Sequence, residues 1–283
     1  MGNPMVHLVT VSYYSGPYIA RMLRSVARAT NGETAITIVN NARDDAELDV
    51  VISKTNVKAA IITLDSNRGY GGAVNAANKS SQPHSEWLLV VNPDLSFDPG
   101  AIDELLRVGM SDPAIGVVGP LIYTGAREVY PSARNLPSLR NGVGHALFSR
   151  IWKGNPWTRA YLSDHEVPPR ARSAGWVSGA CMMVRRRAFE SIGGFDEKFF
   201  MYFEDVDLCA RLGRAGWRIL YAPSAEVHHV GGHATEQVNR KMVRAHHTSA
   251  YIYLAARYSA WYLWPLRVAL RVGLTLRGLI AHS

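Results

Sequence analysis

The chain has 283 residues, of which 47% are hydrophobic and 19% are charged. This composition indicates a folded protein with a sizeable core and excludes a disordered chain. Two cysteines, Cys181 and Cys209, are too few for a disulfide framework, and no secretory signal is recognised at the start. We therefore expect a cytoplasmic protein in which both thiols are buried.

The net charge of +8 is concentrated toward the C-terminal end. Residues 240–283 contain seven Lys or Arg residues and no Asp or Glu, so the preceding 239 residues hold 24 basic and 23 acidic residues. This charge balance indicates that the segment binds an anionic partner or an anionic surface.

Strand patterns and helical patterns alternate along the chain. They predict strands at residues 6–12, 34–40, 59–64 and 87–91, and helices at residues 17–29, 72–79, 98–109 and 206–215. Because apolar strands joined by helices form parallel sheets with helices on both faces, we expect an α/β fold. Ligands of such sheets bind beyond the carboxyl ends of the strands.

Polar residues follow each predicted strand at that edge. They are Tyr13, then Asn40 and Asn41, then Asp65 and Asn67, then Asn92 and Asp94. The edge gathers acids, amides and an aromatic ring, which is a set suited to a nucleoside.

Residues 125–172 have weak periodicity and many Pro, Gly and Arg residues. This pattern predicts a long insertion or mobile loop, the usual place for substrate-specific contacts. No domain boundary is evident before about Gln237.

A glycine-rich run, NRGYGGAVN, spans residues 67–75 and leads into a predicted helix. Glycines let backbone N–H groups approach a ligand, and a helix N-terminus favours an anion such as a diphosphate. The run is not the dinucleotide fingerprint and follows the third strand, which disfavours a dehydrogenase. A turn that only permits close helix–sheet packing is the alternative.

Acids lie among aromatic and aliphatic residues in the run 195–209, where an unpaired charge is costly. Carboxylates in such surroundings take a proton or face a cation. The alternative is an acidic first helical turn, in which Glu204, Asp205 and Asp207 favour the helix dipole.

A second set of polar residues suits a metal. Asn92 and Asp94, joined by Pro93, can offer oxygen ligands to Mg²⁺, although a simple Asx turn is the alternative. Three histidines lie in residues 227–233, with a spacing that matches no structural zinc pattern. One of them either joins Asp94 on a metal, contacts a diphosphate or is structural.

Seven motifs in this order resemble the inverting glycosyltransferases of family 2, whose nucleotide-sugar-binding fold is called GT-A. The nearest match is the bacterial rhamnosyltransferase branch. The motifs are residues 9–13, 39–41, 67–71, 92–94, 176–182, 193–196 with 199–207, and 229–232. The resemblance implies a GT-A domain over residues 1–236, with a mostly parallel sheet and helices on both faces, followed by an amphipathic helical tail over residues 237–283.

The resemblance also implies roles for four residues. Asp205 matches the catalytic base that takes the proton of the acceptor hydroxyl, and Glu204 orients the acceptor or Asp205. Asp94 matches the last acid of the D-x-D metal motif, and His229 matches a metal or phosphate histidine. A divalent Mg²⁺ or Mn²⁺ cofactor is implied, neutralising the leaving diphosphate.

Other residues match binding positions of the family. The resemblance implies nucleotide-sugar contacts for Ser12, Tyr13, Asn41, Asp65, Asn67, Gly69, Asn75 and Asn92, backbone contacts to the sugar and acceptor for Gly179 and Ala180, and a stacking platform for the acceptor at Trp176. Two positions depart from the pattern: Asn92 replaces the first acid of D-x-D, and Asn41 replaces an acid after the second strand.

The tail has a helical pattern after Pro265. One face carries Val268, Val272, Leu276, Leu279 and Ile280, and arginines lie toward the other face. The arginines interrupt each apolar run, so a membrane-spanning helix is not expected. Basic and aromatic residues beside an apolar face suit a helix lying on anionic lipid, and a helix packed on the body or on a second copy is the alternative.

The resemblance implies transfer of L-rhamnose from dTDP-rhamnose to a polyprenyl-diphosphate-linked GlcNAc in cell-envelope polysaccharide synthesis, at the inner face of the cell membrane. Two alternatives stay open: a family 2 transferase with a galactosyl or glucosyl donor, and a non-catalytic nucleic-acid-binding protein. No nucleic-acid-binding module is recognised, so no nucleic-acid partner is expected. The oligomeric state is left open, a homo-oligomer included.

Overall fold

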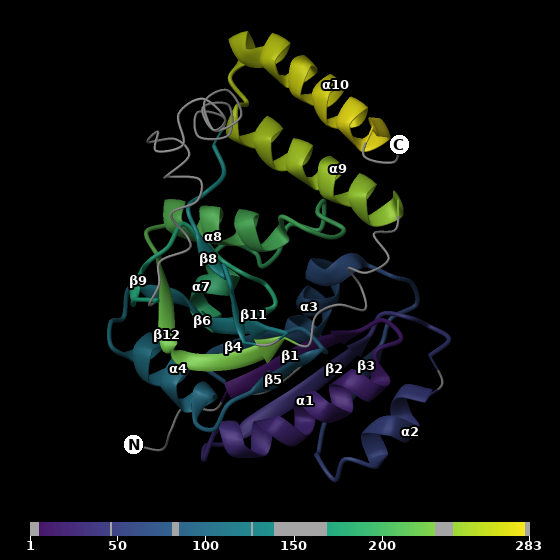
Figure 1. Cartoon of the computed structure of the whole chain (residues 1–283), viewed down its shortest axis with the longest axis vertical. Helices are drawn as coiled ribbons and strands as arrows, with labels where there is room; N and C mark the ends of the chain where they lie inside the picture. Colours follow the sequence, from purple (N-terminus) through teal and green to yellow (C-terminus); the bar gives the residue numbers. More distant parts are fainter. Residues whose placement is uncertain are drawn as a thin grey trace.

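A central sheet runs through the computed structural model, with helices on both sides (Figure 1). The structure describes residues 6–45, 47–80, 85–125, 127–138, 169–229 and 240–280. The strands are β1 (Val6–Ser12), β2 (Thr34–Asn40), β3 (Ala60–Thr63), β4 (Trp87–Val91), β5 (Leu95–Phe97), β6 (Ile115–Thr124), β7 (Glu128–Tyr130), β8 (Ala133–Arg134), β9 (Arg172–Ser173), β10 (Trp176–Val177), β11 (Cys181–Arg185) and β12 (Arg218–His229). The helices are α1 (Gly16–Ala29), α2 (Glu47–Ser53), α3 (Gly69–Ser80), α4 (Ala101–Met110), α7 (Arg186–Ser191), α8 (Glu204–Arg214), α9 (Arg240–Arg257), the short η1 (Trp261–Leu263) and α10 (Trp264–Ile280).

The sheet has the strand order β3-β2-β1-β4-β11-β6-β12-β5. The four predicted strands form its parallel part, β3-β2-β1-β4. Beyond them, β11 lies antiparallel between β4 and β6, whereas β12 lies parallel to β6. Cys181, the first residue of β11, pairs with Val91, the last residue of β4. The start of β11 therefore lies at the edge where β4 ends.

Alternate residues of the strands build two separate cores. On one face, Leu8 and Leu89 pack with residues of α1, α2 and α4. On the other face, Val9 and Val90 pack with residues of α3, α7 and α8. These strands read as continuous apolar runs because both faces of the parallel sheet are buried. Both cysteines are buried, as expected.

The predicted elements agree closely with the structure in the first half of the chain. The strands at residues 6–12, 34–40 and 87–91 are confirmed with the same bounds, and β3 is two residues shorter than predicted. The helix α2 was not predicted. Within residues 125–172, β7 and β8 are regular strands that pair with β6 and β10. Residues 139–168 of the expected mobile loop lie outside the described residues.

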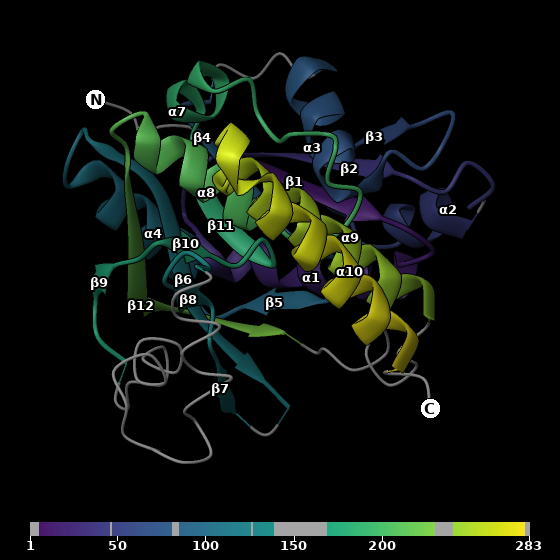
Figure 2. The same ribbon diagram turned by 90° about the horizontal axis from the view of Figure 1, so that it is seen from above.

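Two C-terminal helices, α9 and α10, lie side by side, with α9 between α10 and the rest of the protein (Figure 1, Figure 2). Tyr253 of α9 is buried against Phe199, Val206 and Ala210, and thus contacts α8 and the segment before it. Among the described residues, no helix combines the length and the apolar character needed to cross a membrane.

Gly69 joins the start of α3 to the segment that precedes α8. Its φ of +72° is left-handed, and a Cβ built on it would lie 2.2 Å from the carbonyl oxygen of Phe200. The N–H of the next residue, Tyr70, donates to that same oxygen at 3.1 Å. Only glycine fits here, because a side chain would be strained and would also collide with backbone.

We predict that Gly69→Ala lowers the free energy of unfolding more than Gly100→Ala does. Gly100 has a similar φ of +76° with open space around it, so alanine there meets only the left-handed strain, about 1–2 kcal/mol. At Gly69 the collision with Phe200 adds to that strain. Denaturant unfolding of both variants measures the difference, and equal losses would contradict the close contact.

Candidate active site

The predicted ligand edge lies where β1 and β4 end and β11 begins. The strand order reverses direction between β1 and β4, which makes this point a topological switch point. The N–H of Asn92, after β4, donates to the carbonyl of Ala180, before β11, at 2.8 Å. Ser12 is buried at the end of β1, whereas the neighbouring Tyr13 ring is 56% exposed. The structure thus brings these predicted residues to one edge.

Asp205 lies in the first turn of α8, facing this edge. Its Oδ2 accepts the N–H of Gly179 at 2.8 Å, and its Oδ1 accepts the N–H of Val206 at 2.8 Å. Both hydrogen bonds favour the carboxylate form. Burial raises the pKa of Asp205 above its ordinary value and outweighs these hydrogen bonds. The result is a fixed carboxylate with raised basicity.

Glu204 is buried beside Asp205, with 8% of its surface exposed. Its Oε2 has no hydrogen-bond partner within the described part of the chain. Burial, and then repulsion from Asp205, raises the pKa of Glu204 to about 8. Since two adjacent buried carboxyl groups resist ionising together, the raised pKa values belong to the pair, which binds a proton more tightly than free carboxyl groups do.

Tyr70 is a site residue that the sequence analysis did not single out, although it lies inside the glycine-rich run. Its hydroxyl donates to the carbonyl of Gly179 at 2.8 Å. Burial, followed by the negative charges of Glu204 and Asp205, raises the pKa of Tyr70 well above its ordinary value. The Gly179 residue is therefore held on both sides, by Tyr70 at its carbonyl and by Asp205 at its N–H.

The turn that leads into Glu204 has an unusual backbone. Tyr202 and Phe203 both have left-handed φ angles, 67° and 66°, although neither is glycine. Each such residue costs about 1–3 kcal/mol and persists only when surrounding contacts impose it. Phe203 is the residue immediately before α8, so the strain lies directly beside the two carboxyl groups.

Asp94 and His229 form the predicted metal pair. β5 follows Asp94 and runs antiparallel to β12, with Leu95 opposite His229. This pairing places the His229 Nε2 atom 3.0 Å from Asp94 Oδ1, and both side chains are partly exposed. Among the described residues no three His, Cys, Asp or Glu side chains converge. One carboxylate and one imidazole, completed by diphosphate oxygens and water, fit Mg²⁺ or Mn²⁺.

Asn41 holds the glycine-rich turn. Its side-chain amide donates to Asn67 Oδ1 at 2.9 Å and to the Gly69 carbonyl at 3.2 Å, and its Oδ1 accepts the N–H of Arg68 at 2.9 Å. Asn67 also accepts the N–H of Gly69 at 2.9 Å. These amides thus shape the turn, and Asp65 lies exposed at the start of it.

Asn75, for which a nucleotide contact is predicted, makes hydrogen bonds within the protein through its side chain. Its amide donates to the Phe195 carbonyl at 2.9 Å and to Glu197 at 3.2 Å, and its Oδ1 accepts the N–H of Phe195 at 3.0 Å. Both amide protons are used. Asn75 lies more than a turn into α3, and it holds the loop between α7 and α8.

Trp176 lies on β10, which packs against α8, the helix that carries Asp205. Its indole N–H donates to the Asn135 carbonyl at 3.1 Å, and the Arg134 guanidinium lies 5.8 Å from the ring centroid. Arg134 also acts on Asp205, lowering its pKa, though by less than burial raises it. No sequence signal distinguished Arg134 from the many arginines of residues 125–172.

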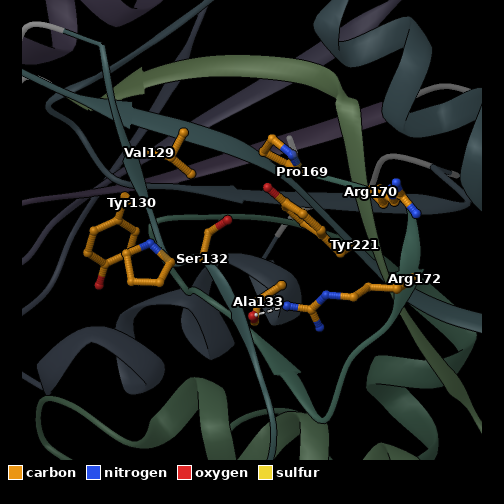
Figure 3. Close-up of a pocket in the computed structure, with 9 residues that line it drawn as sticks. Val129, Tyr130, Ser132, Ala133, Pro169, Arg170, Arg172 and Tyr221 are labelled. Atoms are coloured by element: carbon orange, nitrogen blue, oxygen red, sulfur yellow. Dashed lines mark hydrogen bonds between the residues drawn. The ribbon is translucent and has the colours of Figure 1, made fainter. Parts of the chain in front are cut away.

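A separate small pocket lies between β7, β8, β9 and β12 (Figure 3). Arg172 crosses it, donating to the Ala133 carbonyl at 2.8 Å and lying 5.6 Å from the Tyr221 ring. None of the residues that line this pocket belongs to the predicted site. The candidate active site is therefore the sheet edge and not this pocket.

Comparison with protein families identifies residues 4–248 as a match to the model described as glycosyltransferase like family 2. The chain belongs to glycosyltransferase family 2. It is 42% identical to N-acetylglucosaminyl-diphospho-decaprenol L-rhamnosyltransferase of Mycobacterium tuberculosis (strain ATCC 25618 / H37Rv), over 95% of this chain and 90% of that protein. It is 40% identical to Rhamnosyltransferase WbbL of Escherichia coli (strain K12), over 89% and 94% of the two chains.

Solved structures confirm the predicted GT-A fold of this glycosyltransferase. The mannosyltransferase PcManGT from Pyrobaculum calidifontis, in complex with GDP-Man and Mn²⁺, matches with a TM-score of 0.61 and 14% identity, over 99% of this chain and 75% of that one. GalNAc-T7 with UDP, GalNAc and Mn²⁺ matches with a TM-score of 0.60 and 15% identity, over 96% and 54%.

We predict that Glu204→Gln stabilises the protein at alkaline pH. Between the ordinary value of 4.5 and about 8, folded Glu204 binds more protons than the unfolded chain does, so the free energy of unfolding falls as pH rises through this range. Glutamine cannot ionise and avoids this loss. Denaturant unfolding at pH 5 and pH 9 should show a larger gain for the variant at pH 9, by about 1 kcal/mol or more.

The matched control is Glu33→Gln, at an exposed surface position. If the gain of Glu204→Gln is the same at both pH values, Glu204 does not hold a proton in the folded protein.

Proposed function

We propose that the protein is an inverting transferase that moves L-rhamnose from dTDP-rhamnose to GlcNAc-diphosphoryl-polyprenol. The observation that carries the proposal is Asp205, a carboxylate of raised pKa that the Gly179 N–H fixes at the switch point of the sheet. The two rhamnosyltransferases that share 40% or more identity with the chain support the donor sugar and the acceptor class.

Asp205 acts as the base in this proposal. As the acceptor oxygen forms a bond to the anomeric carbon, its proton passes to Asp205, and the bond from that carbon to the dTDP oxygen breaks. Attack from the side opposite dTDP inverts the anomeric centre. A base of raised pKa is well matched to this step, because it accepts a proton more readily near neutral pH.

Glu204 orients the acceptor. In its protonated form it can donate one hydrogen bond, and its buried Oε2 has no partner among the described residues. Gly179 and Ala180 line the same space through their backbone, and Trp176 forms its wall.

The nucleotide occupies the edge formed by Ser12, Tyr13, Asn41, Asp65 and Asn67, near the start of α3. Asp94 and His229 are the residues that would hold Mg²⁺ or Mn²⁺. The bound ion would neutralise the charge that develops on the departing diphosphate. The single acid and the histidine of this chain place their donor atoms at 3.0 Å, close enough to share one ligand.

We predict that Asp205→Asn loses at least 100-fold of the transfer rate, because an amide cannot accept the proton. The assay follows labelled rhamnose from dTDP-rhamnose into a short-chain GlcNAc-diphosphoryl-polyprenol, with and without Mg²⁺ or Mn²⁺. Asp207→Asn is the matched control, since Asp207 pairs with Arg211 in the same helix and should keep most activity.

Activity that survives in folded Asp205→Asn would remove Asp205 as the base. If the wild type transfers glucose or galactose from its nucleotide and not rhamnose, the donor assignment is wrong while the transferase stands. An unchanged rate without added metal and in the presence of a chelator would remove the role of Asp94 and His229.

We also propose that α10 and η1 lie on an anionic membrane surface on the cytoplasmic side, which brings the lipid-linked acceptor to the site. The support is an exposed apolar and aromatic surface: Trp261 is 82% exposed, Tyr262 64%, Trp264 60%, Val268 52% and Val272 52%. Arg267, Arg271 and Arg277 lie on α10, and residues 240–283 as a whole carry seven basic residues and no acid. Aromatic rings and cations together are the composition of an interfacial helix.

We predict that the protein sediments with vesicles that contain anionic lipid and that Trp261→Ser with Trp264→Ser weakens this binding about tenfold or more. Met110→Ser, which removes an apolar side chain that is 53% exposed on α4, is the control and should bind normally. If the tail variant binds vesicles as well as the wild type does, the membrane proposal is contradicted. Self-association that the same substitutions abolish would instead point to a surface for a second copy.

A further inference from the structure

Helix α9 holds the strained turn from which the two carboxyl groups project. The hydroxyl of Ser249 donates to the carbonyl of Met201 at 2.8 Å. Ser249 is 3% exposed, so this hydrogen bond is protected from water. It fixes the backbone immediately before Tyr202 and Phe203, the two residues with left-handed φ angles.

The rings of the turn also pack on α9. The Phe203 ring centroid lies 5.8 Å from that of Tyr253 and 5.4 Å from that of His246. His246 also contacts Tyr202 edge-on, at 5.5 Å between ring centroids. One helix therefore meets three consecutive residues of the turn, Met201 through its carbonyl and the other two through their rings.

These contacts explain how a strained backbone persists. Two adjacent non-glycine residues with positive φ relax unless their surroundings impose that conformation. Relaxation here would move Glu204 and Asp205, since they follow directly in the chain. Gly179, just before β11, also holds Asp205, so α9 and the segment before β11 together fix the first turn of α8.

We propose that Ser249 is a positioning residue for glycosyl transfer, which acts through the Met201 carbonyl to fix the placement of Asp205. The proposal rests on the proposed role of Asp205 as the base. It assigns to the C-terminal helices a part in catalysis that is independent of membrane binding. A positioning role of this kind affects the turnover step, because small displacements of a reacting group reduce the rate strongly.

The test compares Ser249→Ala with Thr248→Ala in the full-length protein. Thr248 is the neighbouring residue on the same helix and is exposed, so its variant removes a hydroxyl without touching the turn. We expect Ser249→Ala to lower kcat roughly tenfold with an unchanged KM for the donor, and Thr248→Ala to behave as the wild type. His246→Ala, at an exposed position, should lower kcat in the same direction.

The pH profile separates positioning from general loss of structure. A loosened turn admits water to the carboxyl pair, which lowers its pKa values, so the acidic limb of kcat/KM moves to lower pH in Ser249→Ala. Arg134 on β8 faces the pair and lowers the pKa of Asp205, though by less than burial raises it. Tyr70 on α3, Tyr202 in the turn and Cys209 on α8 also face the pair, and burial, followed by the negative charge of the pair, raises their pKa values. A variant that merely contains less folded protein keeps the wild-type profile.

Hydrogen exchange provides a readout that does not depend on activity. Backbone amides of residues 199–206 should exchange faster in Ser249→Ala than in Thr248→Ala. Unchanged exchange there, or an unchanged kcat and pH profile despite faster exchange, would overturn the proposal. If the wild type transfers no sugar, the proposed function fails, and the exchange result alone then decides whether α9 holds the turn.

Discussion

Gly179 lies just before the antiparallel strand β11, and side chains from two other elements hold its peptide groups. Asp205 of α8 accepts its N–H, and Tyr70 of α3 donates to its carbonyl. Tyr70 in turn depends on Gly69, whose missing side chain lets the Phe200 carbonyl approach α3. Asp205, the glycine-rich turn and the start of β11 are therefore one connected unit, and displacing any part of it moves the others.

The parallel half of the fold could be predicted from the sequence because its signals are local. Each strand of β3-β2-β1-β4 is a short apolar run, and helices follow in regular alternation. The place of β11 could not be predicted in this way, since an apolar run does not reveal its direction or its neighbours. The pairing of β5 with β12, which joins Asp94 to His229, is likewise a contact between residues 135 positions apart.

In the candidate site, too, some features could be predicted from the sequence and others could not. Motif order predicted roles for Asp205, Glu204, Asp94 and His229, and the structure places the side chains of Asp94 and His229 3.0 Å apart. Motif order does not show that the Asn75 side chain makes hydrogen bonds to Phe195 and Glu197. The roles of Tyr70 and Ser249 depend on hydrogen bonds to backbone carbonyls that are distant in the chain. No residue pattern encodes such a partner.

The insertion of β11 between β4 and β6 has a consequence for the order of folding. Strands β1, β2 and β3 are neighbours in both sequence and space, so their pairing closes only short loops. β11 must join β4 and β6 from far along the chain, and contacts of long sequence separation form slowly because loop closure costs entropy. The Gly179–Asp205 contact can form only after that strand is in place. We therefore expect a partly folded chain to form the edge at the ends of β1, β2 and β3 before Asp205 is fixed by Gly179.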